Sequence, residues 1–221
     1  MSFYLPSRNE YSRLETMSDL LVHIAGLTAA LLAVPLLIMR TLSTGTSDFG
    51  LVGVSVYGLT LIAMILCSML YNMTHPQTWT PYLQRLDHSA IYLKIAGTYT
   101  AFALLSPHET GWFLVWIWSC AALGVGLRTF VPNRWRSVAI SLYLIMGWSG
   151  VIAGDALFGG MSSLFFGLIL GGGLIYTVGF GFFVATRLPF HRTIWHLLVI
   201  VASSFFYSAV ATQIGPLSGT N

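Results

Sequence analysis

The sequence predicts an all-α membrane protein that folds as one bundle of seven transmembrane helices. Of its 221 residues, 56% are hydrophobic and only 8% are charged, and the mean hydropathy is +0.77. Soluble domains carry about 25% charged residues, so a chain of this composition cannot form a water-facing surface. The apolar residues also fall into seven blocks. The lengths of most blocks are close to the number of residues, about 20, that a helix needs to cross a bilayer.

The seven apolar segments follow one another with short connections. They run over Met17–Met39, Phe49–Tyr71, His88–Leu105, Gly111–Phe130, Val138–Gly154, Ser162–Ala185 and Thr193–Ile214. Turn-forming residues occupy several of the connections, and none of these is long enough for a soluble domain. We therefore expect a cytoplasmic tail over residues 1–16, a seven-helix domain over residues 17–214 and a short external tail over residues 215–221.

The distribution of arginine predicts how the bundle is oriented. Eight arginines lie in the N-terminal tail or in the second, fourth and sixth connections, whereas only Arg40 lies on the other side. Because short cytoplasmic loops carry the excess of Lys and Arg, we expect a cytoplasmic N-terminus and an external C-terminus. The polar residues 1–16 do not form a cleavable signal peptide, so the first segment is expected to be a retained anchor. The net charge of +3 gives no indication of nucleic-acid binding.

Polar residues gather where four segments meet the expected cytoplasmic side. They are His23 in the first segment, Ser68 and Asn72 at the end of the second, Asp87 at the start of the third, and Arg192 and His196 at the start of the seventh. Ionisable groups inside a membrane are costly and mark functional sites by default. This level of the bundle is therefore the candidate site.

Lys94 lies inside the third segment, about 10 Å or two helical turns from Asp87. Its side chain either extends to the cytoplasmic surface, as long basic side chains do near the ends of membrane helices, or lines a polar cavity within the bundle. The sequence leaves both interpretations open.

Several stretches of this chain resemble one known family. The most distinctive is Leu86–Tyr92, followed directly by Ile95–Thr100. Further matching stretches are Glu15–His23 with Gly26, Ser68–Tyr71, Leu142–Trp148, Gly172–Tyr176 and Ile194–His196. Together they resemble the hemolysin III family, the bacterial branch of the progestin and adipoQ receptor superfamily. The resemblance covers nearly the whole chain and implies a seven-helix protein of the bacterial inner membrane with a cytoplasmic N-terminus.

The resemblance also implies a zinc site. Adiponectin receptors of this superfamily hold zinc near the inner leaflet with one histidine of the second helix and two of the seventh, four residues apart. A serine and an aspartate stand beside the metal. This arrangement resembles a lipid amidase that acts on ceramide, in which three protein ligands leave a position for a water of pKa about 7. Carried over to this chain, the catalytic residues are Ser68, Asp87 and His196.

Two of the three implied zinc-ligand positions differ in this chain. They are Asn72 and Arg192, and only His196 is retained. A carboxamide is a poor zinc ligand, and a guanidinium has no lone pair to give. His191 and His75 are available as substitutes, but a spacing of five places His191 and His196 about 140° apart around a helix. We therefore expect no cofactor, with zinc bound only if the histidines have been rearranged.

The replacements suggest a different, zinc-free site. In this hypothesis Arg192 supplies the positive charge and pairs with Asp87, because a planar guanidinium suits a carboxylate in surroundings of low polarity. Ser68 and Asn72 would add hydrogen bonds. The alternative is that Arg192 simply extends to the cytoplasmic headgroups.

Three functions remain open at this point. The substitutions favour a catalytically silent relative that binds or senses a membrane lipid, or a lipid-like small molecule, at the inner-leaflet side of the bundle. The second is a zinc-dependent, ceramidase-like hydrolase with a rearranged metal site. The third is the cytolysin or pore former that the family name implies, although neither a cleavable signal nor a soluble form is indicated.

Overall fold

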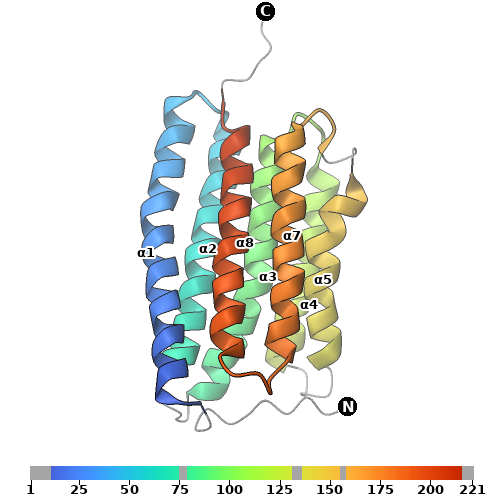
Figure 1. Ribbon diagram of the computed structural model, residues 1–221. Coiled ribbons are helices and arrows are strands. Elements are labelled where there is room, and N and C mark those ends of the chain that lie inside the picture. Colours follow the sequence, from blue (N-terminus) through green and yellow to red (C-terminus); the bar gives the residue numbers. More distant parts are fainter. Residues whose placement is uncertain (1–10, 75–78, 131–135, 155–157, 216–221) are drawn as a thin grey trace, which may run out of the picture.

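The computed structural model describes residues 11–74, 79–130, 136–154 and 158–215. Within these ranges the regular structure consists of α1 (Arg13–Ser43), α2 (Asp48–Met73), α3 (Thr80–Leu105), α4 (Gly111–Phe130), α5 (Arg136–Ala153), α7 (Ser163–Val184) and α8 (His191–Gln213). The helices run side by side as one bundle (Figure 1). The predicted all-helical fold is confirmed.

Five helices, α1, α2, α4, α7 and α8, are long and apolar enough to cross a membrane. α5 contributes a shorter apolar stretch, Ser141–Ala153, and α3 carries several polar residues along its first half. Both lie in the same bundle (Figure 1). A helical membrane protein is therefore confirmed, whereas the count of seven spans, the orientation and the division into tails and a membrane domain stay predictions.

α3 lies at the centre of the bundle and contacts α2, α4, α5 and α8. Its tyrosines tie it to α5, because the hydroxyls of Tyr92 and Tyr99 donate to the carbonyls of Ala139 and Gly147, each at 2.7 Å. A buried tyrosine is stable only where its hydroxyl finds such a partner. This central position explains why the polar residues of α3 face protein instead of lipid.

Two helices begin a full turn or more before the apolar segments predict. α1 begins at Arg13 because Ser12 and Glu15 form a capping box, in which each side chain accepts a hydrogen bond from the backbone amide of the other. α3 begins at Thr80, with Pro81 in its first turn. Asp87 consequently lies inside α3, two turns from its start, and not at the beginning of the helix, where the sequence placed it.

α7 and α8 pack closely because of glycine. A Cβ atom built on Gly172 would lie 2.9 Å from the ring of Phe206, nearer than real Cβ atoms approach. The close approach brings Tyr176 of α7 beside Phe206, with ring centroids 5.9 Å apart. These two rings become part of a cavity wall described below.

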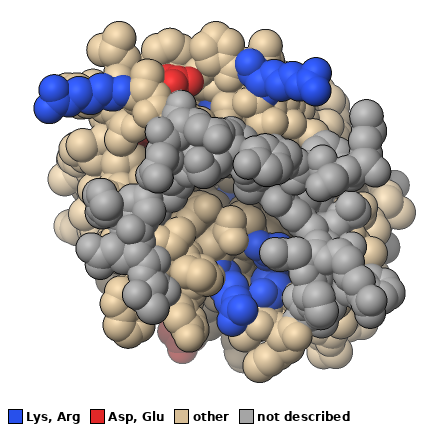
Figure 2. All heavy atoms as spheres, turned by 90° about the horizontal axis from the view of Figure 1, so that it is seen from below, with Lys and Arg blue, Asp and Glu red and all other residues tan. Residues whose placement is uncertain are grey.

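One end of the bundle carries most of the described arginines. They are Arg13 and Arg85 near the starts of α1 and α3, Arg128 near the end of α4, Arg187 between α7 and α8, and Arg192 in the first turn of α8. Figure 2 shows this end from below, where basic side chains are prominent and few acidic atoms are visible. Arg40 lies at the opposite end of α1. The arginines from which the orientation was predicted thus gather at one end of the bundle, and the orientation itself stays a prediction.

Candidate functional site

The carboxylate of Asp19 on α1 lies at the centre of a buried polar cluster. Its Oδ2 is 2.8 Å from Nη2 of Arg192, and its Oδ1 accepts a hydrogen bond from Nδ1 of His196 at 2.6 Å. Asp19 is only 1% exposed. An ion pair and a hydrogen bond therefore join the first helix to the last.

His23 lies one turn along α1 from Asp19 and on the same face. Its Nδ1 is 2.8 Å from the Asp19 carbonyl oxygen, which can only accept, so this nitrogen carries the proton. Nε2, which accepts hydrogen bonds when the imidazole is neutral, faces the hydroxyl of Ser68 at 3.2 Å. The rings of His23 and His196 meet edge to face, with centroids 4.4 Å apart.

Ser68 of α2 lies between the two imidazoles. Its Oγ is 3.2 Å from Nε2 of His23 and 3.4 Å from Nε2 of His196. A hydroxyl has one proton and donates to one imidazole at a time. Asn72 donates from Nδ2 to the backbone carbonyl of Ser68 at 2.9 Å, so its side chain folds back onto its own helix.

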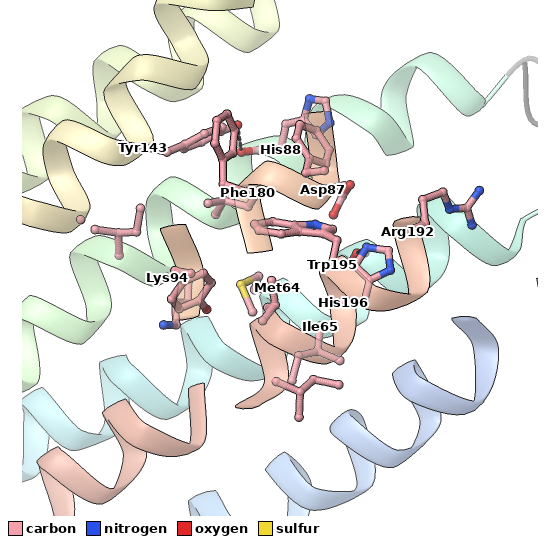
Figure 3. Close-up of a pocket in the computed structure, with 18 of the residues that line it drawn as sticks. Met64, Ile65, Asp87, His88, Lys94, Tyr143, Phe180, Arg192, Trp195 and His196 are labelled. Carbon is pink, nitrogen blue, oxygen red and sulfur yellow. Dashed lines mark hydrogen bonds between the residues drawn. The ribbon is translucent and has the colours of Figure 1, made fainter. Parts of the chain in front are cut away.

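Asp87 of α3 is buried and lines the same cavity as Ser68 and His196. It does not pair with Arg192, and the predicted Asp87–Arg192 pair is wrong. The guanidinium of Arg192 points away from Asp87 (Figure 3) and pairs with Asp19. The physical reason is that α8 packs more extensively against α1 than against α3, so that α1 supplies the nearer carboxylate.

Arg192 does not simply extend to the headgroups either, because Tyr11 covers it. The guanidinium carbon of Arg192 lies 4.3 Å from the centroid of the Tyr11 ring, a distance typical of cation–π contacts. The hydroxyl of Tyr11 is 3.0 Å from Nε2 of His191, the first residue of α8. Burial raises the pKa of Tyr11 above the ordinary value for a phenol. The hydroxyl therefore keeps its proton and can donate to the imidazole.

The polar cluster opens into a cavity of about 450 Å³. Sites for small molecules range from about 300 to 1,000 Å³. All the predicted site residues that the structure describes line this cavity: His23, Ser68, Asn72, Asp87, Lys94, His191, Arg192 and His196. Apolar and aromatic side chains, including Met64, Ile65 and Trp195, form much of the remaining wall (Figure 3). The cavity is thus polar at one end and largely apolar elsewhere, as a site for an amphiphile would be.

A second basic group lines the cavity from the side of α4 and α5. Arg128 of α4 is hydrogen-bonded through Nη2 to Nδ1 of His88, and Tyr143 of α5 donates to the His88 carbonyl at 3.0 Å. These residues add a positive charge to the mouth of the cavity and were not predicted from the sequence.

Lys94 faces the cavity and not the cytoplasmic surface. It is 3% exposed and lines the cavity between α3, α7 and α8. Of the two interpretations that the sequence left open, the structure supports the cavity lining.

Comparison with known proteins assigns the chain to a family. The sequence profile described as Haemolysin-III related matches residues 12–207. This chain belongs to the hemolysin III family. It is 34% identical over 204 residues to Hemolysin-3 of Bacillus cereus, covering 91% of this chain and 93% of the relative. It is also 34% identical over 199 residues to the Hemolysin-3 homolog of Bacillus subtilis (strain 168), covering 89% and 92%.

The family assignment confirms the resemblance seen in the sequence. Together with the long apolar helices, it establishes an integral, multi-pass membrane protein, as expected of a protein of the bacterial inner membrane.

The residues at the implied zinc positions do not fit a zinc ion. Asn72 donates its amide to the backbone of its own helix, and Arg192 is held in an ion pair. His191, a predicted substitute, is bonded to Tyr11, and His75 lies outside the described residues. Beside His196, Arg192 has no lone pair to give, and Asn72 offers only a carboxamide, which is a poor zinc ligand.

A different group, Asp19, His23 and His196, is compact enough to consider as a metal site. One ligand atom from each lies within 4.8 Å of the others. However, Arg192 and His196 already bond the two carboxylate oxygens of Asp19. A metal ion here would also be repelled by the adjacent guanidinium. The geometry therefore favours a metal-free cluster in which Arg192 supplies the positive charge.

Sequence reasoning missed Asp19, although a signal was present. Asp19 and His23 are four residues apart in the first apolar segment, and Arg192 and His196 are four apart in the last. A spacing of four places both members of each pair on one helix face. An acidic residue at the same expected depth as two basic ones was an indication that α1 and α8 meet.

Proposed function

We propose that this hemolysin III family member binds a lipid inside its helix bundle at a metal-free site and does not hydrolyse it. The observation that carries the proposal is the ion pair between Asp19 and Arg192, with arginine at a position where zinc-binding relatives have a histidine. Zinc hydrolysis needs a metal with an open position that activates water. A guanidinium supplies charge but no such position.

The cavity supports a lipid as the ligand. Its volume of about 450 Å³ and its apolar wall suit one hydrocarbon chain. The polar cluster at its mouth provides hydrogen-bonding groups, among them the imidazole nitrogens that face Ser68. We infer that all seven helices span the membrane with the N-terminus in the cytoplasm. The basic end of the bundle, and with it this mouth, then lies at the inner leaflet.

Lipid extraction tests this proposal. The protein is purified in mild detergent, and the lipids bound to it are identified by mass spectrometry. Gly173→Phe places a large side chain at the cavity wall, whereas Gly181→Phe changes an exposed position of the same helix. We expect the wild type and the control Gly181→Phe to retain one lipid class, and Gly173→Phe to lose it. An identical set of lipids on all three proteins would contradict a specific site.

A second candidate is a zinc-dependent lipid amide hydrolase with a rearranged metal site. The compact group Asp19, His23 and His196 favours it. Its test is the release of fatty acid from a fluorescent ceramide, with and without added zinc. Zinc-dependent release that is lost in His196→Ala would replace the first proposal, which predicts no release under either condition.

The relatives' name, Hemolysin-3, raises pore formation as a third function. Dye-loaded vesicles that contain the reconstituted protein test it. We expect the dye to be retained, and release at low protein-to-lipid ratios would contradict that expectation.

A further inference from the structure

Lys94 is the single lysine of the chain, because nine of the ten Lys and Arg residues are arginine. It lies in α3, is 3% exposed and lines the cavity. Its Nζ lies 4.8 Å from the centroid of the Tyr176 ring and 4.6 Å from that of Phe206. Figure 3 shows it away from the polar cluster, on the side of the cavity opposite Arg192. The ammonium group thus occupies an aromatic part of the wall.

No carboxylate neutralises this ammonium group within the described residues. The ion pairs found there all involve Asp19, and Asp87 is about 10 Å or two turns away along α3. A charged side chain at membrane depth is costly unless it is paired. Two aromatic faces attract a cation, but they supply no counter-ion.

We propose that Lys94 binds the carboxylate of a single-chain lipid, that is, a fatty acid held inside the bundle. This inference rests on the proposed lipid-binding function and specifies the charge of the ligand. A polar group near Lys94 suits a carboxylate head: the Tyr176 hydroxyl lines the cavity and lies 3.0 Å from Oγ of Ser203, and a hydroxyl can donate to a carboxylate. Arg128, which lines the same cavity, also favours the entry of an anion.

Binding of a matched pair of ligands tests the proposal. Oleate and oleyl alcohol have the same chain and differ in the charge of the head group. Their affinities are measured on the purified full-length protein, on Lys94→Met and on Lys94→Arg. We expect Lys94→Met to bind oleate about tenfold more weakly or worse, as removal of a charge-assisted hydrogen bond predicts. Oleyl alcohol should bind Lys94→Met as it binds the wild type, and Lys94→Arg should retain most of the affinity for oleate.

A second measurement keeps the lysine and its ability to carry a positive charge. Reductive methylation with ¹³C-formaldehyde labels only Lys94 and the N-terminal amine, because the chain has no other lysine. The dimethyl-lysine NMR signal should shift on titration with oleate and much less with oleyl alcohol. The N-terminal signal serves as the internal control.

The outcomes separate this inference from the function on which it rests. Suppose that both ligands bind the wild type, but that oleate does not shift the Lys94 NMR signal and binds Lys94→Met with unchanged affinity. The carboxylate site is then overturned while lipid binding stands. If Lys94→Met weakens both ligands equally, Lys94 has only a structural role and the proposal is likewise overturned. If neither ligand binds the wild type, both the inference and the proposed function fail.

Discussion

The guanidinium of Arg192 lies 2.8 Å from the carboxylate of Asp19, and this pair connects the two helices at opposite ends of the chain. Asp19 is almost completely buried, with 1% of its surface exposed. A buried carboxylate without its partner retains the full cost of its desolvation. The pair therefore positions His196 and His23 around Ser68, and the whole cluster depends on it.

Breaking the pair should destabilise the protein. We expect Arg192→Gln to lower the free energy of unfolding by about 3 kcal/mol, because it leaves the Asp19 carboxylate buried and unpaired. Asp19→Asn should have a similar effect, and the double substitution should cost clearly less than the sum of the two. Thermal unfolding in detergent measures all three. Arg187→Gln, an exposed arginine just before α8, is the control and should leave the melting temperature unchanged.

Restoring histidine at the two altered positions should create a zinc site. The double substitution Asn72→His with Arg192→His supplies the two ligands that the chain lacks beside His196. Three histidines match the usual ligand number of a catalytic zinc site. We expect about one zinc per chain by elemental mass spectrometry, and much less for either single substitution. Failure of the double variant to take up zinc, despite normal folding, would show that Asn72 and Arg192 do not occupy the positions assigned to them.

The Tyr11 cover should contribute measurably to stability. Tyr11→Phe removes the hydrogen bond to His191 but keeps the ring over Arg192, so we expect a loss of about 1 kcal/mol. Tyr11→Ala removes both interactions and should cost more. The comparison uses the same melting assay, with Tyr82→Phe at an exposed tyrosine as the control. Equal melting temperatures for Tyr11→Phe and Tyr11→Ala would mean that the ring contact contributes nothing.

Close packing of α2 against α3 predicts a strong effect at Gly97. A Cβ atom there would meet the side chain of Thr60, whose hydroxyl donates to carbonyls of its own helix. We expect Gly97→Ala to cost about 1–3 kcal/mol by overpacking. Gly126→Ala on α4 has open space around it and should be neutral or slightly stabilising. If both substitutions had the same effect, steric packing at Gly97 would not be the cause.

The sequence predicts the fold well because the apolar segments are long and clearly separated. Its errors lie at the helix starts. Thr80 to Asp87 is polar, so a search for apolar residues begins α3 only at His88, although the helix itself starts at Thr80. Hydropathy reports where a helix enters the hydrocarbon, whereas capping residues such as Ser12 decide where it begins.

The candidate site was predictable in its level but not in its pairing. Ser68, Asn72, Asp87 and His196 were expected near one end of the bundle, and the structure brings all of them to one cavity. Which carboxylate meets Arg192 depends on the packing of α8 against α1. The spacings of four in Asp19–His23 and Arg192–His196 indicate this packing but do not by themselves establish it. The resemblance directed attention to positions around a metal, and Asp19 was not among them.

The metal content of the purified wild-type protein tests the central claim most directly. The protein is prepared without chelator, exposed to an excess of zinc and desalted, and its zinc is counted by elemental mass spectrometry beside His196→Ala. If the Asp19–Arg192 pair takes the place of the metal, zinc should stay well below one per chain and be the same in both proteins. About one zinc per chain in the wild type, lost in His196→Ala, would contradict the metal-free site and make the hydrolase the leading interpretation.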